Sequence, residues 1–305
     1  MDQIQKTLLA QVADLHEVPS GAYNIRANGT SAGRNTTANI DIVTKEGQDG
    51  IDIIIKPFTQ KESVHLPVLL SETGIQDMVY NDFFIGEGAD VTIVAGCGIH
   101  NGGDKESRHD GIHTFHVGKN AKIKYVEKHY GQGDGNGQNV MNPTTVIEIE
   151  DGGYMEMDTV QIKGVDSTKR VTTAKLGAEA TLIIHEKIMT HGEQYAETDF
   201  TVDMDGEGCH ANLVSRSVAK GNSKQIFRSN IKGNNRCTGH SECDAIIMDN
   251  AVVAAIPEIT ASHLDASLIH EAAIGKIAGE QLIKLMTLGL TEQEAEEQIV
   301  NGFLK

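Results

Sequence analysis

A glycine-containing turn recurs along this chain, and a short strand-like segment follows each copy. The five anchors of the turn are Gly86, Gly118, Asp151, Gly177 and Gly206. Successive anchors are 32, 33, 26 and 29 residues apart. Because no long helix intervenes, this pseudo-repeat favours short strands stacked on copies of themselves, as in a β-solenoid. A β-sandwich would produce similar alternation and is the alternative fold.

The strand-like segments alternate apolar and charged residues, as in Ile51-Asp52-Ile53 and Met155-Glu156-Met157. This period of two places one side chain inward and the next in water. Helical periodicity occurs only at the two ends. Ile4, Leu8 and Val12 predict a short helix before Pro19, and Thr291-x-x-Glu294 is a capping box that opens the second of two terminal helices.

These patterns predict an all-β core with a short N-terminal helix and a C-terminal helical hairpin. We expect an N-terminal helical segment over residues 1–24, a solenoid core over residues 25–268 and a helical region over residues 269–305. Aromatic residues make up only 4% of the chain and Trp is absent, so small and β-branched side chains must fill the interior.

Charge and composition exclude several classes of function. The chain has 43 acidic and 26 basic residues, a net charge of -17 that repels nucleic-acid phosphates. No segment approaches the roughly 20 apolar residues of a membrane span. Four cysteines in 305 residues do not resemble a secreted disulfide framework, so we expect free thiols in a soluble, cytoplasmic protein.

The sequence has no nucleotide-binding fingerprint. The glycine-rich stretch over residues 131–139 is a flexible loop that does not match the dinucleotide-binding pattern, and no phosphate-binding P-loop motif is present. We therefore expect no ATP hydrolysis by this chain alone.

Histidines gather in the first half of the chain, in His109, His113 and His116, with Cys97 before them and Glu127 after them. A cupin-like mononuclear metalloenzyme using His109, His113, His116 and Glu127 is one hypothesis. However, residues 113 and 116 differ by three, which on a strand sends their side chains to opposite faces, so the full set cannot converge without a bulge. Structural histidines are the competing interpretation.

A second group of candidate metal ligands occupies the last hundred residues. Its members are Cys209, His210, Cys237, His240, Cys243, Asp244, His270 and Glu271. The simple interpretation is buried thiols and solvated charges. The alternative is a metal site, because Lys232 and Arg236 precede Cys237 and cationic neighbours favour the thiolate. The five residues between Cys237 and Cys243 do not fit the spacing of a zinc knuckle, so iron with sulfur is preferred.

The segment that begins at Cys243 resembles the C-terminal core of the SufB/SufD family of iron–sulfur cluster assembly proteins. The matching segments are residues 243–248, 255–259, 270–277, 280–282, 289–292 and 299–303. Upstream, Cys97 and residues 113–125 resemble another family segment. The resemblance covers most of residues 60–305.

The resemblance implies a right-handed parallel β-helix that builds an iron–sulfur cluster and transfers it to client apo-proteins. It implies a scaffold rather than an enzyme, with ATP hydrolysis by a separate SufC-like ABC ATPase that docks on the C-terminal helices. The chain is most similar to a short archaeal form that pairs with itself through its late turns, so a homodimer in a two-plus-two complex is expected.

The resemblance also implies which residues hold the cluster. Cys243 matches the family's scaffold cysteine, and His270 and Glu271 match its imidazole and acidic partners. Cys237 and Cys209 have no match that assigns them. If they join Cys243, three thiolates would suit a [4Fe–4S] cluster with one carboxylate- or imidazole-held iron, and a [2Fe–2S] cluster is the alternative. A β-solenoid that recruits partners without any cofactor remains a third possibility.

Overall fold

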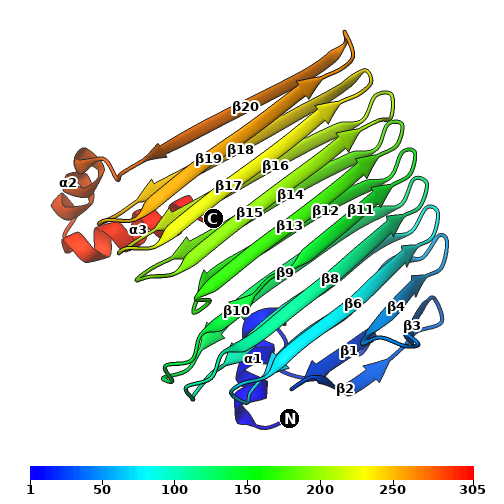
Figure 1. Cartoon of the computed structure of the whole chain (residues 1–305), viewed down its shortest axis with the longest axis horizontal. Coiled ribbons are helices and arrows are strands. Elements are labelled where there is room, and N and C mark those ends of the chain that lie inside the picture. Colours follow the sequence, from blue (N-terminus) through cyan, green and yellow to red (C-terminus); the bar gives the residue numbers. More distant parts are fainter.

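The computed structural model describes residues 1–305 and is a β-solenoid of about eight turns (Figure 1). Its strands form two ten-stranded sheets, and the chain passes back and forth between them. Every strand pairing is parallel except β1 with β2 and β3 with β4. The predicted solenoid is confirmed, and a sandwich is excluded because sandwich sheets are antiparallel.

Sheet 1 contains every strand that carries a cysteine. In spatial order its strands are β2 (Thr30–Asn35), β1 (Ala22–Ala27), β5 (Gln60–Leu70), β7 (Asp90–His100), β9 (Lys122–Gln132), β12 (Tyr154–Lys163), β14 (Thr181–Thr190), β16 (His210–Ala219), β18 (Cys237–Ile247) and β20 (Ala266–Gly275). The boundary expected between residues 268 and 269 falls inside β20, so the solenoid continues to Gly275.

Sheet 2 lies opposite. Its strands are β3 (Ile40–Thr44), β4 (Gly50–Ile55), β6 (Gln76–Ile85), β8 (Ser107–Val117), β10 (Asn139–Met141), β11 (Thr144–Ile149), β13 (Ser167–Leu176), β15 (Tyr195–Met204), β17 (Lys224–Gly233) and β19 (Val252–Ala261). The strands β10 and β11 share one turn of the solenoid and are separated at Pro143, which lacks the amide that a ladder hydrogen bond requires. At the far end, β19 and β20 are the edge strands, and we call this the open end of the solenoid.

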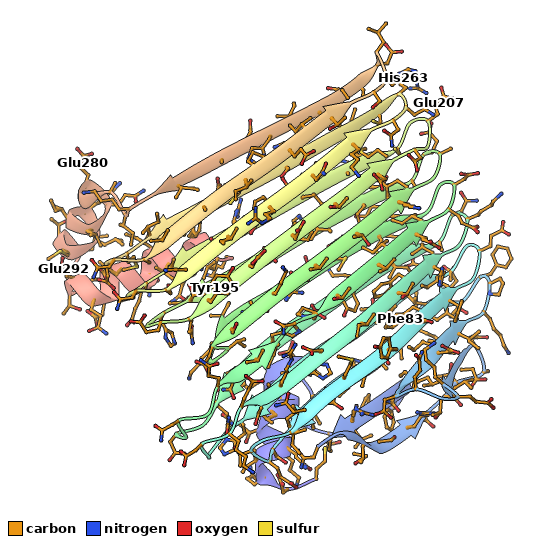
Figure 2. The ribbon with its side chains drawn as sticks, viewed as in Figure 1. Phe83, Tyr195, Glu207, His263, Glu280 and Glu292 are labelled. Carbon is orange, nitrogen blue, oxygen red and sulfur yellow. The ribbon has the colours of Figure 1, made fainter.

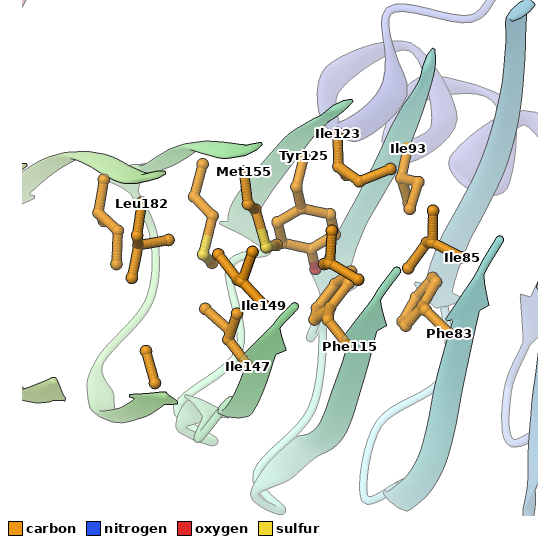
Figure 3. Close-up of a cluster of buried hydrophobic side chains, with 14 of the residues drawn as sticks. Phe83, Ile85, Ile93, Phe115, Ile123, Tyr125, Ile147, Ile149, Met155 and Leu182 are labelled. Atoms are coloured by element: carbon orange, nitrogen blue, oxygen red, sulfur yellow. The ribbon is translucent and has the colours of Figure 1, made fainter. Parts of the chain in front are cut away.

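The interior is a continuous apolar core of inward side chains from both sheets (Figure 3). Because pairing is parallel and in register, like residues stack on one another. Phe83 and Phe115 are register partners whose rings stack with centroids 4.3 Å apart. Most other core positions are Ile, Val, Leu, Ala and Met, as the low aromatic content predicts.

The repeated glycine turns stack directly on one another. The amide of Gly118 donates to the carbonyl of Ile85 at 3.0 Å, and the amide of Gly206 donates to Leu176 at 2.9 Å. A Cβ atom built on Gly206 would lie 1.9 Å from the backbone of Gly177. Glycine is therefore required here by the close approach of neighbouring turns.

The N-terminal helix α1 (Gln3–Ala13) covers the outer face of sheet 1. Leu8 and Val12 pack over Gly98 and Gly96 of β7, where the missing side chains leave room for the helix. The helix ends before the predicted stop at Pro19, because Asp14 takes a left-handed conformation with φ of 53°.

Two helices, α2 (Gly279–Thr287) and α3 (Glu292–Phe303), follow the last strand. The predicted capping box is present, with Thr291 accepting from the amide of Glu294. Val300 and Leu304 pack on Val218, so α3 folds back onto sheet 1. Glu280 and Glu292 lie on these helices, while Glu207 and His263 lie at turns on the opposite side (Figure 2). None of the helices has the length and apolar character needed to cross a membrane.

Two adjacent phenylalanines on β6 test which side chains of this strand point into the core and which point outward. Phe83 is fully buried and Phe84 is exposed on the outer face. We expect Phe83→Ala to lower the free energy of unfolding by about 3–5 kcal/mol, and Phe84→Ala to lower it by less than about 1 kcal/mol. Urea unfolding followed by circular dichroism measures both, and equal losses would contradict the assignment.

Candidate functional site

Strand alternation sorts the candidate ligands at the open end into two sets. On β18, Ser241 and Cys243 point into the solenoid, whereas His240 and Glu242 point outward. Register pairs Ser241 with His270 and Glu242 with Glu271 on β20. His270 therefore shares the inner face with Cys243, and Glu271 lies on the outer face.

Cys243 is buried, with 1% of its surface exposed. Its register neighbours are Ser215 on β16 and Ala272 on β20. Burial, with the nearby carboxylates of Glu186 and Asp244, raises the pKa of the Cys243 thiol to about 12. The thiol is therefore protonated at neutral pH and must lose its proton to bind a metal ion.

His270 lies on the edge strand, and no strand covers it beyond β20. Both of its ring nitrogens are buried and have no hydrogen-bond partner. Burial, assisted by His240, lowers the pKa of this imidazole. A neutral imidazole with free nitrogens is the form that metal ions bind. Cys243 and His270 thus form a pair of potential ligands on the inner face.

The structure does not bring Glu271 to this pair. Its carboxylate lies 3.4 Å from His240 Nε2, and with Glu242 these residues form a separate outer group whose ligand atoms lie within 4.8 Å of one another. Of the two residues expected to supply a ligand beside Cys243, only His270 therefore shares its face, because consecutive residues of a strand point to opposite faces.

Cys209 and Cys237 do not join Cys243 either. They lie on neighbouring turns, where the amide of Thr238 donates to the carbonyl of Cys209 at 3.1 Å. Cys237 and Cys243 are six positions apart on β18, about 20 Å along an extended strand. The expectation that three thiolates of one chain surround one cluster is therefore wrong.

The expected thiolate at Cys237 is also not supported. Its cationic neighbours are neutralised elsewhere: Arg236 lies 3.0 Å from Glu207, and Lys232 lies 3.1 Å from Asp203. Burial raises the pKa of the Cys237 thiol. All four cysteines are free and buried.

The side chains of His113 and His116 lie on opposite faces of β8, as their spacing predicts. His113 points inward, whereas His116 points outward, lies 3.0 Å from Glu148 and stacks on Phe84. The strand β8 pairs with β6 without a bulge. The set His109, His113, His116 and Glu127 therefore cannot surround one metal ion.

Sequence reasoning missed a buried ionic network around Glu127. Arg170 forms a buried ion pair with Glu127 and lies 3.4 Å from Glu186. Tyr125 donates to Glu127 at 3.0 Å, and Ser215 donates to Glu186 at 2.8 Å. These charged residues occupy inward positions between apolar neighbours. A charged residue at an inward position of an alternating strand was the sequence signal that could have identified them.

The network keeps Glu127 ionised inside the solenoid. Burial opposes ionisation of Glu127, but the charges of His129, Arg170 and His113 outweigh it and hold the pKa of Glu127 well below its usual range. A cavity of about 20 Å³ lies among Cys97, His109, His113, Glu127 and His129. This volume fits a single water molecule.

Known proteins resemble this chain over most of its length. Residues 76–303 match the family described as "SUF system FeS cluster assembly, SufBD core domain". An iron–sulfur cluster assembly SufBD family protein of Archaeoglobus fulgidus is 32% identical over 74% of the chain, which spans 60% of that relative. Methanocaldococcus jannaschii has one that is 30% identical over 83% of the chain and 79% of the relative. A third, from Pyrococcus horikoshii, is 26% identical over 89% of the chain and 83% of the relative.

The buried histidines predict how stability depends on pH. Burial lowers the pKa of His113 and of His129 to about 4. In the unfolded chain both titrate near 6.5, as is usual for His. Between these values the unfolded state binds more protons, so the free energy of unfolding falls as the pH drops from about 6.5 to about 4, by up to about 3 kcal/mol per imidazole.

Urea unfolding at a series of pH values measures this slope. His129→Gln removes one titrating group and should flatten the slope, whereas His16→Gln, at an exposed position, should leave it unchanged. A wild-type free energy of unfolding that is constant over this range would contradict the prediction.

Proposed function

Because the chain belongs to the SufBD family of iron–sulfur cluster assembly proteins, we propose that it is a scaffold on which a cluster is built and from which it passes to client apo-proteins. The observation that carries this proposal is the pair of Cys243 and the partner-free His270 on the inner face at the open end. The scaffold is not itself an enzyme in this proposal, and a separate SufC-like ABC ATPase supplies ATP hydrolysis.

The two side chains would contribute differently to binding and release. Cys243 loses its proton when iron binds, because only the thiolate is a ligand. His270 already has free ring nitrogens and needs no such step. An imidazole is a less soft ligand than a thiolate, so the iron held by His270 would be the one exchanged most readily with a client protein.

A second copy of the chain would complete the ligand set. One chain offers one thiolate and one imidazole at this place, so two copies facing each other offer two of each. Four protein ligands are the number that a [4Fe–4S] or a [2Fe–2S] cluster needs. We propose a [4Fe–4S] cluster, and [2Fe–2S] with two His and two Cys ligands is the alternative.

The open end supports pairing of two copies. The strands β19 and β20 have no covering element, and an uncovered edge is a template for another chain. Exposed apolar side chains lie on both strands, including Ile256 at 45% and Ile269 at 52% exposure. An apolar surface of this kind indicates an interaction site.

The terminal helices support docking of the ATPase. Ile283 and Met286 of α2, and Leu288 after it, are exposed although they are apolar. We propose that this surface receives the ATPase, and that its closure on ATP changes the geometry of the last turns. A cytoplasmic location agrees with four free thiols, because disulfides are rare in that compartment.

Anaerobic reconstitution with iron and sulfide tests the scaffold role. We expect the wild type to develop the broad absorption near about 400 nm of a thiolate-ligated cluster, and Cys243→Ser to lose most of it together with bound iron and sulfide. Cys209→Ser is the matched control, a buried free cysteine on another turn, and it should retain the cluster. Equal cluster content in wild type and Cys243→Ser would exclude Cys243, and a colourless wild type would favour the cofactor-free alternative.

Sedimentation equilibrium tests the pairing surface. Ile269→Arg should raise the dissociation constant of the dimer by about thirtyfold, the loss expected at the centre of an interface. Ile54→Arg, at an exposed apolar position near the opposite end, should leave dimerisation unchanged. A monomeric wild type, or equal effects of the two variants, would contradict pairing through β19 and β20.

A further inference from the structure

A second group of metal-type ligands lies on the outer face of sheet 1, several strands from Cys243. Glu156 and Asp158 extend from β12, and His185 extends from the neighbouring β14. Their ligand atoms lie within 4.8 Å of one another, and all three residues are half-buried. His185 Nδ1 lies 3.1 Å from Asp158 Oδ1. Two carboxylates and an imidazole are oxygen and nitrogen donors that suit divalent first-row metal ions.

These three residues line one wall of a cavity. The cavity has a volume of about 610 Å³, and Lys187, Arg216, Glu242 and Lys305 also line it. Lys305 follows α3 and accepts a hydrogen bond from Lys187 Nζ at 2.6 Å, so the chain after α3 closes one side. The volume leaves room for a metal ion with several water ligands beside the three side chains.

A cation already occupies the position between the two carboxylates. Lys124 Nζ lies 3.0 Å from Glu156 and 3.1 Å from Asp158. Burial raises the pKa of Asp158, but hydrogen bonds from Lys124 and His185 outweigh this and lower it, so the carboxylate is ionised at neutral pH. The Lys124 side chain is 48% exposed on a flexible stem, so it can withdraw into solvent when a doubly charged ion competes for the carboxylates.

Register connects this group to the open end. Asp158 pairs with His185, His185 with Val214, Val214 with Glu242, and Glu242 with Glu271. His185 and Glu242 are thus two strands apart, about 10 Å. Glu242 lines the same cavity and belongs with His240 and Glu271 to the other outer group of potential ligands. This outer row of register partners therefore ends on β18 and β20, the two strands that carry Cys243 and His270 on their inner face.

We propose that Glu156, Asp158 and His185 bind a divalent transition-metal ion, and that this is a loading site from which the ion passes along the row to Glu242 and Glu271. The identity of the ion as Fe²⁺ rests on the proposed function, whereas the existence of the site does not. Lys124 is the internal competitor that keeps the site closed when metal is scarce.

Titration of the full chain with Mn²⁺ in the absence of sulfide tests the site, because the electron paramagnetic resonance signal of free Mn²⁺ disappears on binding. Asp158→Asn and His185→Ala should each weaken binding by more than about tenfold. Lys124→Met should tighten it, because the competing cation is gone. The matched controls His116→Ala and Glu148→Gln, an outer-face pair on sheet 2 without a third ligand, should bind as the wild type does.

Wild-type affinity in Asp158→Asn and His185→Ala, or unchanged or weaker binding in Lys124→Met, would overturn the site. Loading is tested by the rate of cluster formation at limiting Fe²⁺, which should fall about tenfold in His185→Ala and recover with excess Fe²⁺. An unchanged rate would overturn loading. Cys243→Ser should keep Mn²⁺ binding while losing the cluster. A wild type that forms no cluster but still binds Mn²⁺ through His185 would refute the proposed function and leave the metal site standing.

Discussion

Parallel strand stacking in register is the constraint on which this structure depends. Each side chain lies beside its register partner on the next turn, and neighbours along a strand point to opposite faces. The inner rows build the core, as Phe83 does with Phe115. The outer rows build ladders of charge, as Lys124 does with Glu156. The same rule places Cys243 and His270 on the same inner face of adjacent strands, whereas Glu271 meets His240 on the outer face.

The interior also contains charge, which such a core accommodates only when it is paired. Arg170 lies between Glu127 and Glu186, and hydroxyl groups complete the hydrogen bonds of both carboxylates. Replacing one partner would leave an uncompensated buried charge, at a cost of about 3–5 kcal/mol. Burial keeps the imidazoles of His113 and His129 neutral, against the attraction of Glu127, and burial together with Glu186 keeps the Cys243 thiol protonated. Burial therefore determines which of these groups hold protons, while Arg170 helps to keep the pKa of Glu127 low.

Much of the fold could be predicted from local patterns. The stacked turns at Gly118 and Gly206, the alternating strands and the capping box at Thr291 all appear where the sequence indicates them. The division of His113 from His116 followed from strand geometry. Helix α1 ends before Pro19 because Asp14 takes a left-handed conformation, which the spacing of the apolar residues does not specify.

The site was harder to predict, because spacing along the chain does not give register between turns. Cys237 and Cys243 appear close in the sequence, but they lie far apart along the same extended strand, β18. His270 and Glu271 are adjacent, and for that reason they face apart. Arg170 on β13 and Glu186 on β14 belong to opposite sheets and meet because both side chains point into the interior. The group at Glu156, Asp158 and His185 was missed because it forms only through the register of β12 with β14.

The central claim is that Cys243 and His270, and not Glu271, share the inner face where iron is held. Pulsed electron paramagnetic resonance of the reconstituted and reduced protein tests it most directly, because an imidazole ligand couples its nitrogen nucleus to the cluster spin. The account predicts a nitrogen coupling in the wild type that disappears in His270→Ala and persists in Glu271→Gln. A wild type without this coupling, or a coupling that His270→Ala leaves intact, would contradict it.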